Sequence, residues 1–148
     1  MCITIEAFSA AHIKDISELE TLCFSDPWST DALAEELTNP CAHFLTALEK
    51  NIVVGYIGCH HIAGEGYVTN VGVRPQHRRR GIARKLVAAA IEQGAALSRL
   101  TLEVRESNAA AIALYESLGF VKDGIRPHFY SHPTENACIY SYYYPDQR

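Results

Sequence analysis

One stretch of this 148-residue sequence, residues 71–90, constrains the fold more than any other. It reads VGVRPQHRRRGIARKLVAAA, an apolar run that ends at Val73, breaks at Pro75, passes through a basic turn and continues beyond Gly81. Apolar residues in the last part recur at the 3.6-residue spacing of a helix with one buried face, at Ile82, Leu86, Val87, Ala90 and Ile91. The stretch therefore predicts a strand that runs through a basic loop into the N-terminus of a helix.

This predicted helix start is suited to binding an anion. The first N–H groups of a helix have no partner within the helix, and the helix dipole places partial positive charge there. Gly81 and Ala83 are small enough for a phosphate to approach the backbone, and three consecutive arginines add charge. A solvated basic turn before a surface helix would have the same sequence pattern, so an anion site and a solvated turn both stay open at this point. Neither GxxxxGK[ST] nor a GxGxxG that follows a strand is present.

Length and charge narrow the class of protein. A chain of 148 residues is expected to form a single domain, residues 1–148, with a sizeable core. The net charge of −4 argues against a dedicated nucleic-acid-binding protein, which usually carries a basic excess. No signal-peptide pattern and no run of 18 apolar residues is present, so we expect a cytoplasmic protein with no membrane partner.

The cysteine pattern favours reduced, mostly packed thiols. The five cysteines are scattered and odd in number, without a CxxC pair. Cys59 and His61 would share one face of a strand, but two ligands do not make a zinc site. We therefore expect no metal.

Apolar periodicity and turn residues predict a mixed α/β domain with a central sheet of about seven strands flanked by about four helices. Helices are expected to begin at Ser9, at Ser29 or Thr30, after Gly81 (ending near Ser98) and at Ser107 or Asn108. The strands are expected at residues 3–7, 43–48, 52–61, 67–74, 100–105, 120–125 and 137–144. Only 67–74 and 100–105 are expected to pair in parallel, because a helix connects them. A ligand would then fit between these two strands.

The pattern Arg78-x-x-Gly81-x-Ala83 after a strand resembles the coenzyme A pyrophosphate loop, [QR]-x-x-G-x-[GA], of the GCN5-related N-acetyltransferases. Residues 102–120, LEVRESNAAAIALYESLGF, resemble the same region of the ribosomal-protein-alanine N-acetyltransferases within that superfamily. Residues 23–29, CFSDPWS, and 126–130, RPHFY, are similar to further segments of this subfamily. The resemblance covers nearly the whole chain and implies a GNAT-like domain that uses acetyl-CoA.

The resemblance also implies which residues bind the cosubstrate. They lie at the end of the first parallel strand, in the basic loop, at the helix start and at the cap of the last helix. The implied residues are Val71, Gly72, Val73, Arg78, Arg79, Arg80, Gly81, Ile82, Ala83, Arg84 and Asn108. In related enzymes a bulge in that strand lets a backbone N–H stabilise charge on the thioester oxygen, and we expect the same here.

Acetyl transfer to an amine needs a base for the amine and a proton for the leaving thiolate. An α-amine has a pKa of about 7.7–8.0 against about 10.4 for lysine, so its proton is roughly 3 kcal/mol easier to remove near neutrality. The resemblance gives the base role to Glu103 and the acid role to Tyr115. Without it, Glu103 would read as a surface glutamate and Tyr115 as a core aromatic.

The acceptor implied by the resemblance is the N-terminal alanine of a ribosomal protein, as a basic peptide, with Trp28, Phe129 and Tyr130 as peptide-binding residues. The chain departs from the subfamily pattern at Asn136, which replaces a common aspartate, at His128, which precedes the aromatic pair, and near Tyr140, where methionine is frequent. The acceptor is therefore the least constrained feature.

Alternative functions use the same features. The acceptor could be another N-terminus, a lysine or a small amine, and a coenzyme A-binding domain without turnover is a different class. Nucleic-acid binding through residues 77–80 and Arg84 would need more basic surface than the chain has. The sequence does not indicate an oligomeric state.

Overall fold

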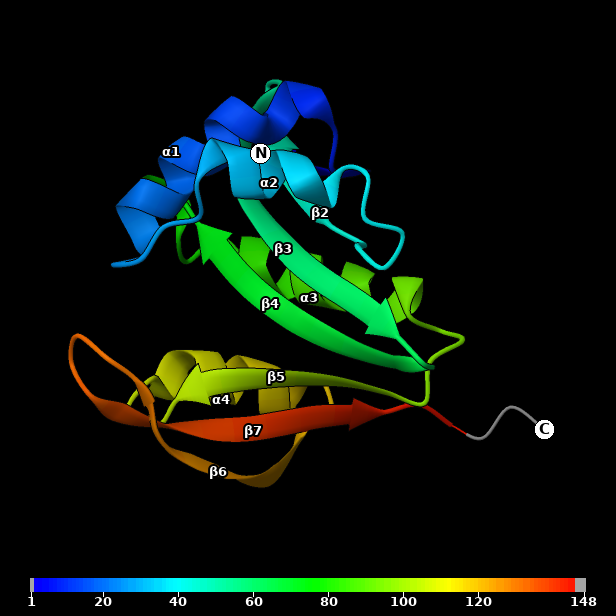
Figure 1. The fold of residues 1–148 in the computed structure, drawn as a ribbon, viewed down its shortest axis with the longest axis vertical. Helices are drawn as coiled ribbons and strands as arrows, with labels where there is room; N and C mark the ends of the chain where they lie inside the picture. Colours follow the sequence, from blue (N-terminus) through cyan, green and yellow to red (C-terminus); the bar gives the residue numbers. More distant parts are fainter. Residues whose placement is uncertain (1, 146–148) are drawn as a thin grey trace.

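Seven strands form one mixed sheet in the computed structural model, which describes residues 2–145 (Figure 1). The strands lie side by side in the order β1-β2-β3-β4-β5-β7-β6, and only β4 and β5 are parallel. Their bounds are β1 Thr4–Ala7, β2 Leu45–Glu49, β3 Ile52–Ile62, β4 Glu65–Val73, β5 Arg99–Arg105, β6 Val121–Tyr130 and β7 Glu135–Tyr143. This confirms the predicted mixed sheet.

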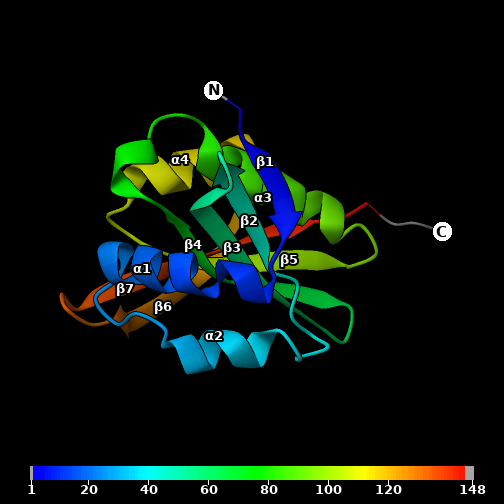
Figure 2. The ribbon, with the colours of Figure 1, turned by 90° about the horizontal axis from the view of Figure 1, so that it is seen from above.

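Helices cover both faces of this sheet, α1 and α2 on one side and α3 and α4 on the other (Figure 2). Their bounds are α1 Ile13–Cys23, α2 Thr30–Glu36, α3 Ile82–Gln93 and α4 Ala109–Ser117, with short 3-10 turns η1 Ala10–His12 and η2 Pro75–His77. Each face has an apolar core, built on the α3 side around Ile82, Leu86 and Val87 and on the α1 side around Leu19 and Leu33. No helix within residues 2–145 is both long and apolar enough to cross a membrane.

Side-chain caps define where two of the helices begin. The Ala32 N–H donates to Ser29 Oγ at 3.0 Å, and the Ala111 N–H donates to Asn108 Oδ1 at 3.2 Å. Ser29 and Asn108, rather than Thr30 and Ser107, are therefore the caps of α2 and α4. Ser9 precedes η1 instead of α1 itself.

Two predicted boundaries were wrong. Helix α3 ends at Gln93 and not near Ser98, because Gly94 is a poor helix former and the chain turns there, with the Leu97 N–H bonded to the Gly94 carbonyl at 2.8 Å. Strands β6 and β7 also extend further toward their connection than predicted. The prediction missed residues 126–130 because they are mostly exposed and show no apolar alternation.

The parallel pair opens into a cleft after three residues. The register joins Glu65, Gly66 and Tyr67 of β4 to residues 99–101 of β5 and goes no further. Beyond that point β5 continues to pair with β7 along its whole length, while β4 follows β3 (Figure 1). The two halves of the sheet therefore diverge where the ligand was expected.

A bulge in β4 lies at the start of this divergence. Gly58 of β3 is opposite Asn70 and Cys59 is opposite Val68, which leaves Thr69 as an extra residue. The neighbouring strand accommodates it only because residue 58 is glycine, since a Cβ there would lie 2.5 Å from Thr69 Oγ1. The expected bulged strand is thus present.

Candidate active site

A cavity of about 610 Å³ lies where β4 ends and α3 begins. Every predicted cofactor residue except Arg80 lines it: Val71, Gly72, Val73, Arg78, Arg79, Gly81, Ile82, Ala83, Arg84 and Asn108. We call this the cofactor cavity. Arg80 instead forms an ion pair with Glu49, with Nη1 3.3 Å from Oε2, because the β2–β3 turn brings that carboxylate to the loop.

The N-terminus of α3 is open toward this cavity. Gly81 has a left-handed backbone, with φ of 76°, and no atom lies within 4 Å of the Cβ position that it lacks. No side chain caps α3, whereas Ser29 and Asn108 cap α2 and α4. The first N–H groups of α3 are therefore left for a ligand. Arginine charge surrounds them, so the residues present fit a diphosphate.

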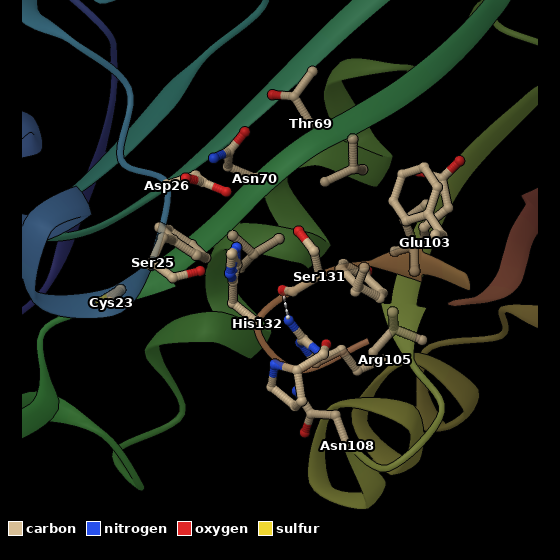
Figure 3. A pocket seen from close by; sticks show the side chains of 18 of the residues that line it. Cys23, Ser25, Asp26, Thr69, Asn70, Glu103, Arg105, Asn108, Ser131 and His132 are labelled. Atoms are coloured by element: carbon tan, nitrogen blue, oxygen red, sulfur yellow. Dashed lines mark hydrogen bonds between the residues drawn. The ribbon is translucent and has the colours of Figure 1, made fainter. Parts of the chain in front are cut away.

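A second cavity, of about 680 Å³, lies in the opening between β4 and β5. Its walls come from the α1–α2 connection, the bulged part of β4, strand β5 and the β6–β7 connection (Figure 3). Glu103, Phe129 and Tyr130 line it, as does Tyr115. We call it the acceptor cavity.

Five residues line both cavities, namely Cys23, Phe24, Val71, Asn108 and Tyr115. The two cavities therefore meet at the end of α1, the outer part of β4 and the inner side of α4. A cosubstrate held in one cavity and an acceptor held in the other would have their reactive ends at this junction. The predicted acid, Tyr115, is at the junction and the predicted base, Glu103, is on the acceptor side.

Tyr115 combines the two interpretations that its sequence position allowed. Its ring packs on Phe120 with centroids 5.7 Å apart, and its side chain is only 7% exposed. Burial raises the pKa of its hydroxyl to about 12, because the phenolate would be poorly solvated. Tyr115 is therefore protonated at neutral pH and able to donate a hydrogen bond at the junction.

Glu103 lies on the face of β5 opposite Leu102 and Val104, whose side chains are buried. Its Oε1 is 3.7 Å from Nε of Arg126, an exposed partner on β6. Burial and, second, the nearby Glu103 carboxylate raise the pKa of the Tyr130 hydroxyl to about 12. The acceptor cavity thus has a carboxylate and two tyrosines near one another.

Arg105 fixes the β6–β7 connection at the mouth of the acceptor cavity. Its Nη1 donates to the Pro133 carbonyl at 3.0 Å and its Nη2 to the Ser131 carbonyl at 3.2 Å. Its guanidinium also lies 4.5 Å from the centre of the Tyr130 ring. The sequence prediction missed this residue, although alternation along β5 places it on the same face as Glu103.

Two of the departures from the subfamily pattern, Asn136 and His128, act on the shape of β6. The Asn136 Oδ1 accepts a hydrogen bond from the His128 N–H at 3.0 Å, and His128 has a positive φ of 54°. An aspartate oxygen could accept the same bond. Neither residue lines the two cavities.

Trp28 also lies outside both cavities. Its ring packs against Phe44 with centroids 6.0 Å apart, on the α1 side of the sheet. The acceptor cavity is lined instead by residues that precede it, Cys23, Phe24, Ser25 and Asp26. The resemblance assigned Trp28 to the peptide, whereas the residues of this segment that line the acceptor cavity come just before it in the chain.

The cysteine and histidine pair on β3 is part of the packing. Cys59 is fully buried, which raises the pKa of its thiol to about 12, and the His61 ring stacks on His43 with centroids 3.9 Å apart. Within residues 2–145, no three His, Cys, Asp or Glu side chains lie close enough together to hold a metal ion.

The cavity pair and the open helix start define a class of protein, and sequence comparison identifies the same class. A profile of the Acetyltransferase (GNAT) family matches residues 13–120. The chain belongs to this family and is an acetyl-CoA-dependent N-acetyltransferase.

One relative and two solved structures resemble this chain over most of its length. The putative [ribosomal protein bS18]-alanine N-acetyltransferase of Bacillus subtilis (strain 168) is 33% identical over 130 residues, which cover 86% of each chain. The crystal structure of the ribosomal-protein-S18-alanine N-acetyltransferase from Escherichia coli has a TM-score of 0.91 at 27% identity, covering 99% of this chain and 97% of that one. A chain of the NatC complex bound to Gag peptide and CoA has a TM-score of 0.84 at 25% identity, covering 98% and 100%.

Proposed function

We propose that this enzyme transfers the acetyl group of acetyl-CoA to the α-amine of an N-terminal alanine, and that the acceptor is a ribosomal protein. The observation that carries the proposal is the junction of the two cavities, where Tyr115 and Asn108 line both and Glu103 lies on the acceptor side. The names of the relatives in Bacillus subtilis and Escherichia coli support the choice of acceptor.

Acetyl-CoA provides an activated thioester, and the cofactor cavity has groups for each part of it. The uncapped N–H groups at the start of α3 would bind the diphosphate, with Arg78, Arg79 and Arg84 around it. Asn108 lies further along, where both cavities meet. Its Oδ1 is used by the helix cap, so its Nδ2 is the atom left to bind the pantetheine arm.

Three groups of the chain act on the reacting atoms in this proposal. Glu103 takes a proton from the ammonium of the acceptor, directly or through water, because only the neutral amine is a nucleophile. A backbone N–H of β4 beyond the bulge stabilises the charge that develops on the carbonyl oxygen. Tyr115 directs its hydroxyl proton to the sulfur as that atom leaves.

The charge of the acceptor cavity supports a basic peptide. Asp26 and Glu103 both line it, and the arginine of its lining, Arg105, is paired with Glu135 at 3.2 Å. Arg126, whose Nε is 3.7 Å from Glu103, is not among the lining residues. A peptide with lysine or arginine after the alanine would therefore be favoured, and its affinity should fall as salt rises.

The test is mass spectrometry of three peptides after incubation with the enzyme and acetyl-CoA. The first has the N-terminal sequence of the organism's own bS18 protein beginning at alanine, the second has the same sequence with a blocked N-terminus, and the third is blocked but contains an internal lysine. We expect one added acetyl group on the first peptide alone. Acetylation of the third would show a lysine acceptor, and acetyl-CoA binding without turnover on a broad amine panel would show a binding domain.

A further inference from the structure

A buried carboxylate lies beneath the acceptor cavity and has no part in the mechanism above. Glu20, on α1, is fully buried. Its Oε1 accepts a hydrogen bond from the Trp28 N–H at 2.8 Å, and its Oε2 accepts from Tyr56 Oη at 2.5 Å and from Asn70 Nδ2 at 3.2 Å. All three donors are uncharged groups, so the carboxylate is solvated by the protein itself.

Two of these donors belong to segments beside the acceptor cavity, while the third, Tyr56 on β3, is fully buried in the core. Trp28 follows the loop from which Ser25 and Asp26 line the acceptor cavity, and Asn70 lines the same cavity next to the bulge at Thr69. Figure 3 shows Asp26, Thr69 and Asn70 together on one side of the cavity and Glu103 on the other. One carboxylate therefore connects the loop wall and the strand wall.

A carboxylate in this place is costly if its only task is packing. Burial of a polar side chain requires its hydrogen bonds to be satisfied, and an apolar side chain of similar volume would fill the space without that requirement. Burial of Tyr56 and, second, the negative charge of Glu20 raise the pKa of the Tyr56 hydroxyl, which keeps that hydroxyl a donor. If Glu20 serves to orient its hydrogen-bond partners, the presence of a buried carboxylate at this position is explained.

The chemistry of the carboxylate determines how Asn70 is oriented. Both oxygens of Glu20 accept hydrogen bonds here, and the Asn70 amide turns its Nδ2 toward Oε2. The other end of the amide, Oδ1, is then left as an acceptor at the cavity wall. A peptide that enters the cavity presents N–H groups, which such an oxygen can bind.

We propose that Glu20 is a positioning residue for the acceptor: it holds the Asn70 amide with Oδ1 toward the cavity, where this oxygen accepts a hydrogen bond from an N–H group of the incoming peptide. This inference rests on the proposed function, because it takes the cavity lined by Asn70 as the site of the peptide. Acetyl-CoA binding is independent of it, since neither Glu20 nor Asn70 lines the cofactor cavity.

The variant Glu20→Gln tests the orientation directly. The glutamine can keep its oxygen on the Trp28 N–H, but its Nε2 then faces Asn70 and requires the asparagine amide to reverse. The cavity wall would present a donor in place of an acceptor. We expect the KM for the alanine peptide to rise about tenfold, the size of one hydrogen bond, with the KM for acetyl-CoA unchanged.

A rescue distinguishes this role from a merely structural one. In the double variant Glu20→Gln/Asn70→Asp, the glutamine Nε2 donates to one aspartate oxygen and the other oxygen is again an acceptor at the cavity. The peptide KM should return toward the wild-type value. Ile16→Val is the matched control, because Ile16 is fully buried on the same helix and contacts the core without joining the network.

The inference is overturned if Glu20→Gln raises both KM values together, if Ile16→Val raises the peptide KM as much, or if the double variant gives no rescue. Should Glu20→Gln fail to fold, Asn70→Ala takes its place, since Asn70 is partly exposed, and an unchanged peptide KM there also overturns it. If the wild-type enzyme leaves the alanine peptide unmodified, the proposed acceptor is wrong. The same comparison is then made with the amine that the acceptor panel identifies.

Discussion

Removal of the Glu103 carboxylate should produce a defect that shrinks as pH rises. A positioned general base contributes about 10²–10⁴-fold, so Glu103→Gln is expected to lower kcat at pH 7 by at least about 100-fold. The amide keeps the size of the side chain on β5, and the cofactor cavity, which Glu103 does not line, is unchanged. The acetyl-CoA affinity should therefore equal that of the wild type.

The pH dependence follows from the pKa of the acceptor and of Tyr115. An α-amine with a pKa of about 7.8 is ~14% neutral at pH 7 and ~94% neutral at pH 9, so the variant should gain about sevenfold relative to the wild type over this range. Tyr115, with its pKa raised to about 12, stays protonated throughout and adds no falling limb. A lysine acceptor, with a pKa of about 10.4, would give a gain of about 100-fold instead.

The assay is the initial rate of coenzyme A release at saturating acetyl-CoA, from pH 6.5 to 9.5. Glu92→Gln, an exposed carboxylate on α3 away from both cavities, serves as the matched control and should behave as wild type. Wild-type turnover of Glu103→Gln at pH 7 would remove Glu103 as the base. A defect of constant size from pH 7 to 9 would show that its role is not deprotonation.

Three further substitutions have expected outcomes that differ in kind. Gly81→Glu should abolish acetyl-CoA binding in isothermal titration, because it places a negative side chain at the helix start. Tyr115→Phe should lower kcat by about 100-fold with the fold intact, as checked by circular dichroism. The same variant should lose less stability at alkaline pH. In the wild type the Tyr115 hydroxyl has a pKa of about 12 when folded and about 10 when unfolded, so the free energy of unfolding falls as pH rises from 10 to 12. The total loss is about 2.7 kcal/mol, and phenylalanine has no hydroxyl to titrate. Gly58→Ala should destabilise the protein by about 1–3 kcal/mol in urea unfolding, since its Cβ would lie 2.5 Å from Thr69 Oγ1.

Controls and contrary results for these variants are equally specific. Gly64→Glu has the same left-handed backbone, with φ of 79°, and the same open space, but lies in the β3–β4 turn, so it should bind acetyl-CoA normally. Affinity lost in both glutamate variants would point to general disruption. An alkaline unfolding curve of Tyr115→Phe that coincides with the wild type would contradict the burial of this hydroxyl. If Gly58→Ala unfolds at the same urea concentration as the wild type, the bulge at Thr69 can shift to make room for the added methyl group without cost.

Local patterns in the sequence were enough to bring together the residues that line the cofactor cavity. The strand, the basic turn and the helix at residues 71–90 are consecutive in the chain, and Asn108 is read as a cap from its own neighbourhood. The exception, Arg80, is drawn away by Glu49, a residue 31 positions earlier in the chain that no local pattern connects to it.

The acceptor side depends on contacts between distant segments. The bulge at Thr69 needs the absence of a side chain at Gly58, and the orientation of Asn70 needs a carboxylate from α1. One signal was available, because Glu20 falls on the apolar stripe of its helix among Ile16, Leu19 and Cys23. A charged residue at such a position predicts either a broken pattern or a buried network, and the sequence alone does not distinguish the two.

The short parallel pairing of β4 and β5 has a consequence for the unliganded protein. Past Tyr67 these strands turn two rows of main-chain amides and carbonyls toward each other across open space, in the middle of a sheet that is otherwise continuous. In the folded protein without ligands, β4 and β5 are not hydrogen-bonded to each other along this central seam, and substrates that enter it can bind to the main-chain groups on either side. Ligand occupancy and resistance to unfolding are therefore coupled in this molecule, and the seam is where the empty enzyme is expected to open first.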